Sequence, residues 1–290
     1  MFLRVIIKFI YMNDTKLQLD GNGTESNPYK ILTVTDLQNM SEDLTACYKL
    51  GDNIDASKTK TWNNGKGFEP IGDEENRFTG ILDGNGYSIT NLYINRTDSN
   101  NIGLFSVLDE YSVIKNITIK NCVIKGREYV GCIAGSNGLY NGGVIQNITV
   151  STVEKIIGFS SVGGIVGYNA ENGELVDLYS DSIVYGDWRV GGIVGNNDGD
   201  VSSASTSGVI LGKKGELGFT GGVIGQNHGV VSSLESTAKV YGNYCVGGII
   251  GWNNGIINGI DSNENVIGET NIDYKIGKNE DKKPVELFQE

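Results

Sequence analysis

The chain has 290 residues, of which 42 are glycine and only 3 are proline, and its formal net charge is −12. Neither a Gly-X-Y repeat nor abundant proline accompanies the glycine, so collagen and Pro/Gly-rich disordered chains are excluded. Because 35 acidic residues outnumber 23 basic ones and no Lys/Arg stripe stands out, we expect no nucleic-acid partner.

The first ten residues are apolar, but Arg4 and Lys8 interrupt them. The run is much shorter than the ~20 residues of a membrane-spanning helix, and no small-residue cleavage site follows it. We therefore interpret residues 1–19 as a leader or disordered N-terminus and expect no membrane insertion. A degenerate signal peptide is the alternative, and Met12 is a second possible start.

Residues 20–67 are expected to form an N-terminal cap. Thr35 to Gln38 has the form of a capping box and predicts a short helix directed toward Met40 and Leu44. Residues 68–95 then alternate apolar and polar side chains around the turn signal Asp83-Gly84-Asn85-Gly86. This pattern predicts one or two opening coils of a larger β-structure.

From residue 102 onward one pattern, an apolar residue or Thr followed by Gly, a variable residue and an apolar residue, returns six times. Its leading glycines recur about every 29 residues, at Gly103, Gly131, Gly163, Gly191, Gly221 and Gly247. In the last five copies a second glycine follows four residues later, and a polar Asn-containing turn comes next. A fixed period of this length is typical of a solenoid.

Each copy also carries two apolar residues three positions apart, and these two residues bracket a turn-prone one. The bracketed residues are Asn116, Asn147, Asp177, Ser203, Ser233 and Gly259. No 3.6-residue periodicity appears, so we predict an all-β fold, a right-handed parallel β-helix over residues 68–277 with about 29 residues per coil. Residues 267–276 are expected to form a final coil, and residues 278–290 a C-terminal tail.

The same residues resemble the GLUG-motif repeat proteins. The resemblance spans residues 20–262 and includes the segments 21–31 and 78–89, although the first copy has Ser106-Val107 where a glycine is expected. Such repeats occur mainly in large extracellular or surface-attached bacterial and archaeal proteins, including regions that accompany immunoglobulin A-cleaving metallopeptidases. The resemblance implies a secreted or cell-surface β-helix and implies no activity.

Candidate catalytic residues are few. The single histidine, His228, occupies a repeat-defined turn that carries Asp198 or Asn254 in other copies, so we interpret it as a loop residue. One histidine also excludes an H-E-x-x-H zinc site. We expect no catalytic residues, metal or cofactor. The alternative is a polysaccharide-degrading enzyme, a lyase or hydrolase, that uses carboxylates of residues 73–83 or 181–189.

The four cysteines are scattered without C-x-x-C spacing, at Cys47, Cys122, Cys132 and Cys245. A chain of this length does not need disulfides to hold a core, so we favour core-filling thiols over disulfides.

A column of polar or aromatic residues follows the second repeat glycine and is expected to face outward. It consists of Ser136, Tyr168, Asn196, Gln226 and Trp252. Aromatic faces stack on sugars and amides form hydrogen bonds, although these rings could instead only cover the coil below. The predicted binding residues are Tyr168, Asn196, Gln226, Trp252, Asn169, Asn197, Asn227 and Asn253.

The resulting hypothesis is a non-enzymatic extracellular adhesion or display module that binds a glycan or protein partner on a lateral face. The other non-enzymatic hypothesis is a passive structural spacer of a larger surface protein. Residues alone do not separate these two roles.

Overall fold

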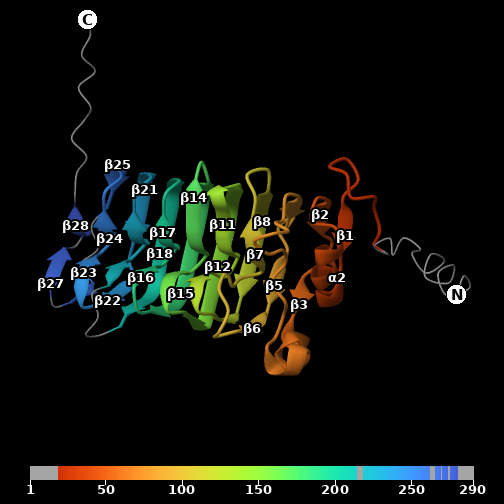
Figure 1. Cartoon of the computed structure of the whole chain (residues 1–290), viewed down its shortest axis with the longest axis horizontal. Helices are drawn as coiled ribbons and strands as arrows, with labels where there is room; N and C mark the ends of the chain where they lie inside the picture. Colours follow the sequence, from red (N-terminus) through yellow and green to blue (C-terminus); the bar gives the residue numbers. More distant parts are fainter. Residues whose placement is uncertain (1–18, 214–217, 262–264, 269, 274, 280–290) are drawn as a thin grey trace, which may run out of the picture.

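The computed structural model describes residues 19–213, 218–261, 265–268, 270–273 and 275–279. Strands stack along one axis into a parallel β-solenoid of about seven turns, with β1 (Tyr29–Ile31) at one end and β28 (Ile276–Asn279) at the other (Figure 1). The predicted all-β parallel fold is confirmed. Most of the predicted leader, residues 1–18, and the end of the predicted tail, residues 280–290, lie outside the described residues.

Three parallel sheets line the described coils. The path of the first sheet consists of β1, β2 (Cys47–Leu50), β4 (Ile81–Asp83), β8 (Val113–Lys120), β12 (Val144–Ile157), β15 (Glu174–Gly186), β18 (Asp200–Gly212), β21 (Val230–Ser236) and β25 (Ile256–Ile260). Short strands extend it: β3 (Ile54–Asp55), β5 (Ser88–Thr90), β6 (Tyr93–Asn95), β9 (Val123–Lys125), β22 (Lys239–Tyr241) and β26 (Val266–Ile267).

The other two sheets carry the repeat glycines. The second sheet consists of β10 (Glu128–Val130), β13 (Ser160–Gly163), β16 (Arg189–Gly191), β19 (Phe219–Gly221), β23 (Tyr244–Gly247) and β27 (Thr270–Asp273). The third sheet consists of β7 (Phe105–Leu108), β11 (Ala134–Asn141), β14 (Val166–Glu171), β17 (Val194–Asn197), β20 (Ile224–Asn227), β24 (Ile250–Asn253) and β28.

Strand register places equivalent repeat positions directly over one another. Val130 pairs with Val162, Val162 with Val190, and Thr220 with Val246. The valines of this column are fully buried, as are the isoleucines at the apolar position after the leading glycine, such as Ile165. Aliphatic side chains from all coils therefore form one continuous interior, and the predicted spacing of about 29 residues is the length of one coil.

The bracketed turn residues adopt the conformation that their chemistry favours. All six have positive φ, from 52° at Asn147 and Ser203 to 98° at Gly259. Asn, Asp, Ser and Gly tolerate this left-handed region better than aliphatic residues. The two apolar residues around each turn can therefore both point inward, as Leu175 and Leu178 do.

The N-terminal end is capped by a helix, as predicted, but the helix begins two residues earlier. Helix α2 (Val34–Asn39) has Thr33 as its N-cap, and the 3₁₀-helix η1 (Met40–Glu42) continues it. Thr33 Oγ1 accepts a hydrogen bond from the Asp36 backbone N–H, and Asp36 Oδ2 accepts one from the Thr33 N–H. Because an Asp completes the reciprocal pair, the capping box starts at Thr33 and not at Thr35.

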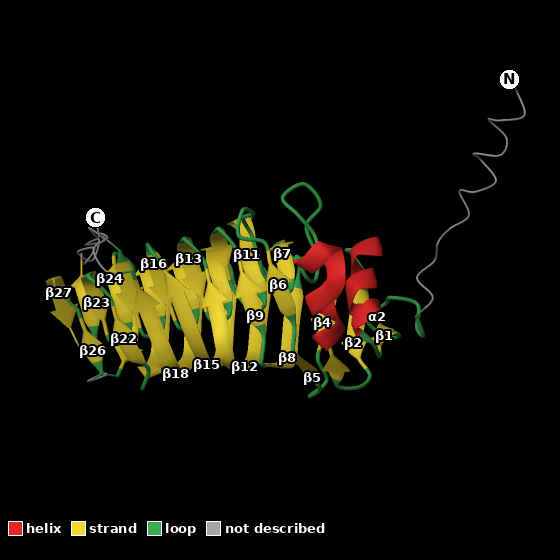
Figure 2. Cartoon of the chain, turned by 90° about the horizontal axis from the view of Figure 1, so that it is seen from below, coloured by secondary structure: helices red, strands yellow, loops and turns green. Residues whose placement is uncertain are grey.

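The helices lie together at the end that contains β1, β2 and β4 (Figure 2). Leu37 and Met40 are fully buried in the common core. A second 3₁₀ segment, η2 (Ser57–Gly65), presents Trp62, which stacks on Phe68. Parallel pairing starts within the expected cap, because β1 pairs with β2 and β2 with β4. The stack therefore begins before residue 68.

At the other end, β26, β27 and β28 form the expected last coil. Its pairing with the preceding coil runs to Asn279, one residue beyond Lys278, where the tail was expected to begin. No helix in the described part of the chain is long and apolar enough to cross a membrane.

Candidate binding face

The predicted column exists as a continuous line on the third sheet. Ser136, Tyr168, Asn196, Gln226 and Trp252 pair in register from coil to coil. Their exposure is uneven, because Ser136 and Gln226 are buried whereas the other three are half-buried. The expectation of a uniformly outward column is therefore correct only in part.

The four asparagines predicted to flank the column do not lie on its surface. Asn169, Asn197, Asn227 and Asn253 are buried, with at most 1% of each residue exposed. Neighbouring residues of an extended strand point in opposite directions, so a half-exposed Tyr168 places Asn169 inward. The prediction that these amides face a ligand is thereby corrected.

These asparagines form a hydrogen-bonded ladder along the solenoid. Each side-chain Nδ2 donates to the Oδ1 of the next coil at 2.7–2.9 Å, through Asn137, Asn169, Asn197, Asn227, Asn253 and Asn279. The same amides donate to backbone carbonyls of the following turn, for example Asn197 to Gly199 O at 2.9 Å. Buried amides need such partners, so the ladder stabilises the stacked turns.

The second repeat glycine explains which side chains meet at the surface. A Cβ at Gly167 would lie 2.4 Å from the Tyr129 carbonyl carbon, and one at Gly225 or Gly251 would collide with the backbone at Val190 or Thr220. Only glycine permits so close an approach. As a result, the residue before each inner Val or Thr lies beside the column residue of the next coil.

This close approach creates side-by-side pairs along one corner of the solenoid. We call the half-exposed and buried members of this region the corner surface: Tyr129, Tyr168, Ser161, Asn196, Arg189, Gln226, Phe219, Trp252, Asp198 and His228. Its aromatic pairs are close, with ring centroids 5.8 Å apart for Tyr129 and Tyr168 and 5.7 Å apart for the stacked Phe219 and Trp252.

Arg189 is the cation of the corner surface. Its Nε donates to Gln226 Oε1, its Nη1 lies 3.5 Å from Ser160 Oγ, and its guanidinium lies 5.4 Å from the centre of the Trp188 ring. Partial burial lowers the pKa of Arg189 from its ordinary value. These contacts hold the guanidinium in one orientation, so it does not need to rearrange before it binds a ligand.

Tyr168 and His228 are also held by polar contacts. The Tyr168 hydroxyl donates to Asp198 Oδ2 at 2.7 Å, and burial, together with this contact, raises the Tyr168 pKa. His228 Nε2 lies 2.8 Å from Gln226 Nε2, and its ring centroid is 5.1 Å from that of Trp252. His228 lies in a turn, as predicted, but it also supports the neighbouring Trp252.

Ser161 and Asn196 form the middle pair of the corner surface. Ser161 Oγ and Asn196 Oδ1 are both buried and have no hydrogen-bond partner among the described residues. A buried polar atom without a partner lowers the stability of the fold. Asn196 lies between Tyr168 and Gln226 in the register of the third sheet, and Ser161 lies beside it on β13 of the second sheet.

Sequence reasoning missed Tyr129, Arg189 and Phe219 as members of this surface. Each lies one position before an inner Val or Thr of the second sheet. The signal was present in the repeat, because these positions have the same 26–32-residue spacing as the leading glycines. Their proximity to the column depends on the approach at the second glycine, which spacing alone does not reveal.

The carboxylates considered for catalysis do not gather around Arg189. Asp187 Oδ2 pairs with Lys213 Nζ at 2.9 Å, and Asp181 is exposed on β15. Asp73 caps its own turn by accepting from the Glu75 and Asn76 backbone N–H groups, which lowers its pKa. Among the described residues, no group of three or more His, Cys, Asp or Glu side chains is placed to hold a metal ion.

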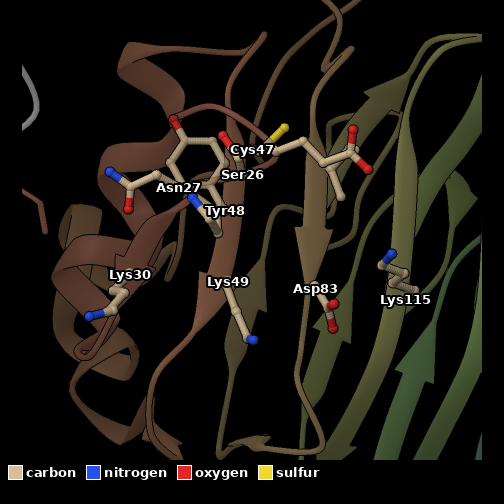
Figure 3. A pocket seen from close by; sticks show the side chains of 11 residues that line it. Ser26, Asn27, Lys30, Cys47, Tyr48, Lys49, Asp83 and Lys115 are labelled. Atoms are coloured by element: carbon tan, nitrogen blue, oxygen red, sulfur yellow. The ribbon is translucent and has the colours of Figure 1, made fainter. Parts of the chain in front are cut away.

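A separate pocket of about 440 Å³ lies on the first sheet near the N-terminal end (Figure 3). Register aligns Lys30, Lys49, Asp83 and Lys115 on four adjacent strands. Lys30 pairs with Asp20, and Asp83 Oδ1 accepts from Asn116 Nδ2 at 3.0 Å. Among the described residues that line it, this pocket has no aromatic pair like those of the corner surface, so we place the candidate binding site on the corner surface.

Comparison with known proteins finds one family model and several proteins to which parts of this chain are similar. The family model of the M26 IgA1-specific metallo-endopeptidase N-terminal region matches residues 25–152. Halomucin of Haloquadratum walsbyi is 39% identical over 165 residues, which represent 54% of this chain but 2% of halomucin. A candidate Gly-rich membrane protein of Evansella cellulosilytica is 35% identical over 193 residues, 55% of this chain and 22% of that protein.

A solved structure shares the fold. The crystal structure of a candidate immunoglobulin A1 protease from Bacteroides ovatus superposes with a TM-score of 0.68 at 21% identity, covering 90% of this chain and 86% of that one. The chain spans less than a quarter of the length of each of the two curated relatives. The family match concerns an N-terminal region and not a catalytic metallo-domain.

Proposed function

We propose that this chain is a non-catalytic β-solenoid module of a larger secreted or cell-surface protein, and that it binds glycans on the corner surface. The small fraction of each curated relative that the match covers supports a modular role. The names of those relatives, a halomucin and a membrane protein, favour the cell surface. The binding role rests on the chemistry of the corner surface.

The observation that carries the proposal is a row of four side-chain pairs along the corner, in which two polar pairs lie between two aromatic pairs. Tyr129–Tyr168 and Phe219–Trp252 provide ring faces, and between them lie Ser161–Asn196 and Arg189–Gln226. Successive coils are ~4.8 Å apart, so the four pairs form one continuous row. Ring faces suit the apolar faces of sugars, and amides and guanidinium suit their hydroxyl and carboxylate groups.

A glycan array probed with the purified chain tests the proposal. Trp252→Ala and Tyr168→Ala should each weaken binding about tenfold, equivalent to about 1.4 kcal/mol, because truncating an aromatic anchor commonly costs this much. Tyr140→Ala is the matched control, because Tyr140 is 79% exposed and outside the corner surface. Unchanged thermal unfolding would show that the variants are folded.

Three results would overturn the glycan proposal. Binding that is equally sensitive to Tyr140→Ala would place the site elsewhere. Absence of glycan binding together with capture of a protein partner that depends on Trp252 would assign the corner surface to protein recognition. Absence of both would leave a structural spacer.

A further inference from the structure

Two cysteines meet inside one coil of the solenoid. Cys122 lies between β8 and β9, and Cys132 follows β10 in the same coil. Their Sγ atoms are 3.0 Å apart, and both side chains are fully buried. A disulfide bond is ~2.05 Å long, so the two sulfur atoms need to approach by only about 1 Å to bond.

The repeat shows that Cys132 stands where later coils have a glycine. Cys132 occupies the position after the leading glycine, where the next four copies carry Gly164, Gly192, Gly222 and Gly248. At Gly164 and Gly222 a Cβ would lie 2.5 Å from the hydroxyl oxygens of Ser180 and Ser236 across the interior. Those coils close through a glycine against a small polar side chain.

The coil that contains Cys132 differs because a side chain fills the glycine position. The sulfur of that side chain points at the sulfur of Cys122 across the interior of the coil. Among the last five copies, only the copy with Cys132 lacks this glycine, and the same coil contains Cys122. This is the arrangement expected of a cross-link and not of two independent core residues.

We propose that Cys122 and Cys132 form a disulfide that cross-links the interior of this coil in an oxidising compartment. The thiolate of one cysteine attacks a disulfide-bearing oxidant, such as oxidised glutathione or a thiol oxidoreductase, and releases one thiol from it. The second cysteine thiolate then attacks the mixed disulfide and releases the other thiol. The protein loses two electrons and two protons, and the oxidant is reduced to two thiols.

Burial determines when the bond forms. The contact with Cys122 and the buried position both raise the pKa of Cys132, so the closed coil disfavours the reactive thiolate. Oxidation therefore precedes closure of the coil during folding. Once formed, the same burial protects the bond from external thiols.

Alkylation in denaturant distinguishes this pair from the other cysteines. The chain is secreted from a host with an oxidising export route, unfolded without reductant, and treated with iodoacetamide. Cys47 and Cys245 serve as internal controls and should be alkylated. Cys245 is as fully buried as Cys122 and Cys132, whereas Cys47 is half-buried. Cys122 and Cys132 should react only after reduction, and the intact mass should lack two hydrogen atoms. Peptide mapping should recover the two cysteines in one cross-linked fragment.

A second measurement removes the dependence on the host. The reduced chain is refolded in a glutathione redox buffer, in which the Cys122–Cys132 bond should form, whereas Cys122→Ser should leave Cys132 fully alkylatable. Full alkylation of all four cysteines after both secretion and refolding would overturn the proposal. Pairing of Cys132 with Cys47 or Cys245 would also overturn it. None of these results depends on glycan binding.

Discussion

Individual asparagines have two different roles in this chain, and the backbone decides which one. Asn116 and Asn147 adopt positive φ at bends within β8 and β12 of the first sheet. Asn169 and Asn197 instead lie in extended strands and join a buried side-chain ladder. The first role follows from local propensity, whereas the second arises only when equivalent coils stack.

The ladder should contribute strongly to stability. Asn197→Ala removes the hydrogen bonds to Asn227 and Gly199 and the one received from Asn169, and it leaves buried groups without partners. We expect a loss of about 2–4 kcal/mol in the free energy of unfolding by urea. Asn141→Ala is the control, because Asn141 is exposed, and it should change stability by less than about 0.5 kcal/mol. Equal effects of both substitutions would contradict a structural role for the ladder.

Tyr48 should make stability depend on alkaline pH. Its hydroxyl is buried and donates to Asp43 O at 2.7 Å, and burial is the main cause that raises its pKa above the ordinary value. The folded state therefore favours the neutral phenol. The resulting stability is complete below the unfolded-state pKa of about 10 and is lost as the pH rises above it.

Urea unfolding of the wild type and of Tyr48→Phe at about pH 8 and pH 11 measures this contribution. At the lower pH the variant should lose about 1 kcal/mol with the hydrogen bond. The difference between the two proteins should shrink or reverse at the higher pH. A difference that does not change with pH would show that Tyr48 ionises as easily in the folded chain as in the unfolded one.

At the scale of the element, coils are joined where glycine lets backbones touch. A Cβ at Gly192 would lie 2.2 Å from Gly222 O and 2.7 Å from Thr206 Cγ2. The neighbouring coil contributes the first atom and the opposite wall contributes the second. The glycine therefore sets both the spacing between coils and the width of the interior.

Gly192→Ala should consequently destabilise the fold by about 3 kcal/mol or more, because backbone cannot move away as a side chain can. Gly51→Ala is the matched control. Its Cβ would clash only with the end of the Leu32 side chain, 2.7 Å from Cδ2, and Leu32 is 53% exposed and can rotate. The free energy of unfolding in urea compares them, and a cost at Gly192 no greater than at Gly51 would contradict this packing.

Elements formed by interactions between residues close in sequence could be predicted better than those formed by contacts between coils. The turns at Asn116 and Asp177 could be predicted, because a local propensity and a recurring spacing agree. The N-cap at Thr33 was missed, because Asp36 serves in place of the usual Glu or Gln. The corner surface could be predicted only in part, since the contact of Tyr129 with Tyr168 joins residues of different coils through close backbone approach.

At the scale of the whole molecule, each inner coil is a replaceable unit, since its main strands pair with their equivalents in the coils before and after it. Deleting residues 162–189 joins Ser161 to Val190, which is the partner of Val162 in register. The shortened chain should fold and unfold cooperatively, with a smaller urea m-value because less surface is buried.

Deleting residues 162–175 instead removes about half a coil and shifts every later inner residue out of its column. That variant should lose cooperative unfolding, as followed by circular dichroism and urea titration. Native-like behaviour of the half-coil deletion would show that register between coils does not govern folding.

The asparagine ladder gives the solenoid a direction. All of its amides donate toward the C-terminal coil, from Asn137 through to Asn279, so their dipoles add head to tail along the axis. Each linking amide therefore donates its N–H toward the C-terminal coils and accepts at its oxygen from the N-terminal side. A coil inserted into the row must therefore present an acceptor to the coil before it and a donor to the coil after it, and a reversed coil would oppose donor to donor. The shared direction of these hydrogen bonds thus specifies the orientation in which a coil can join the stack.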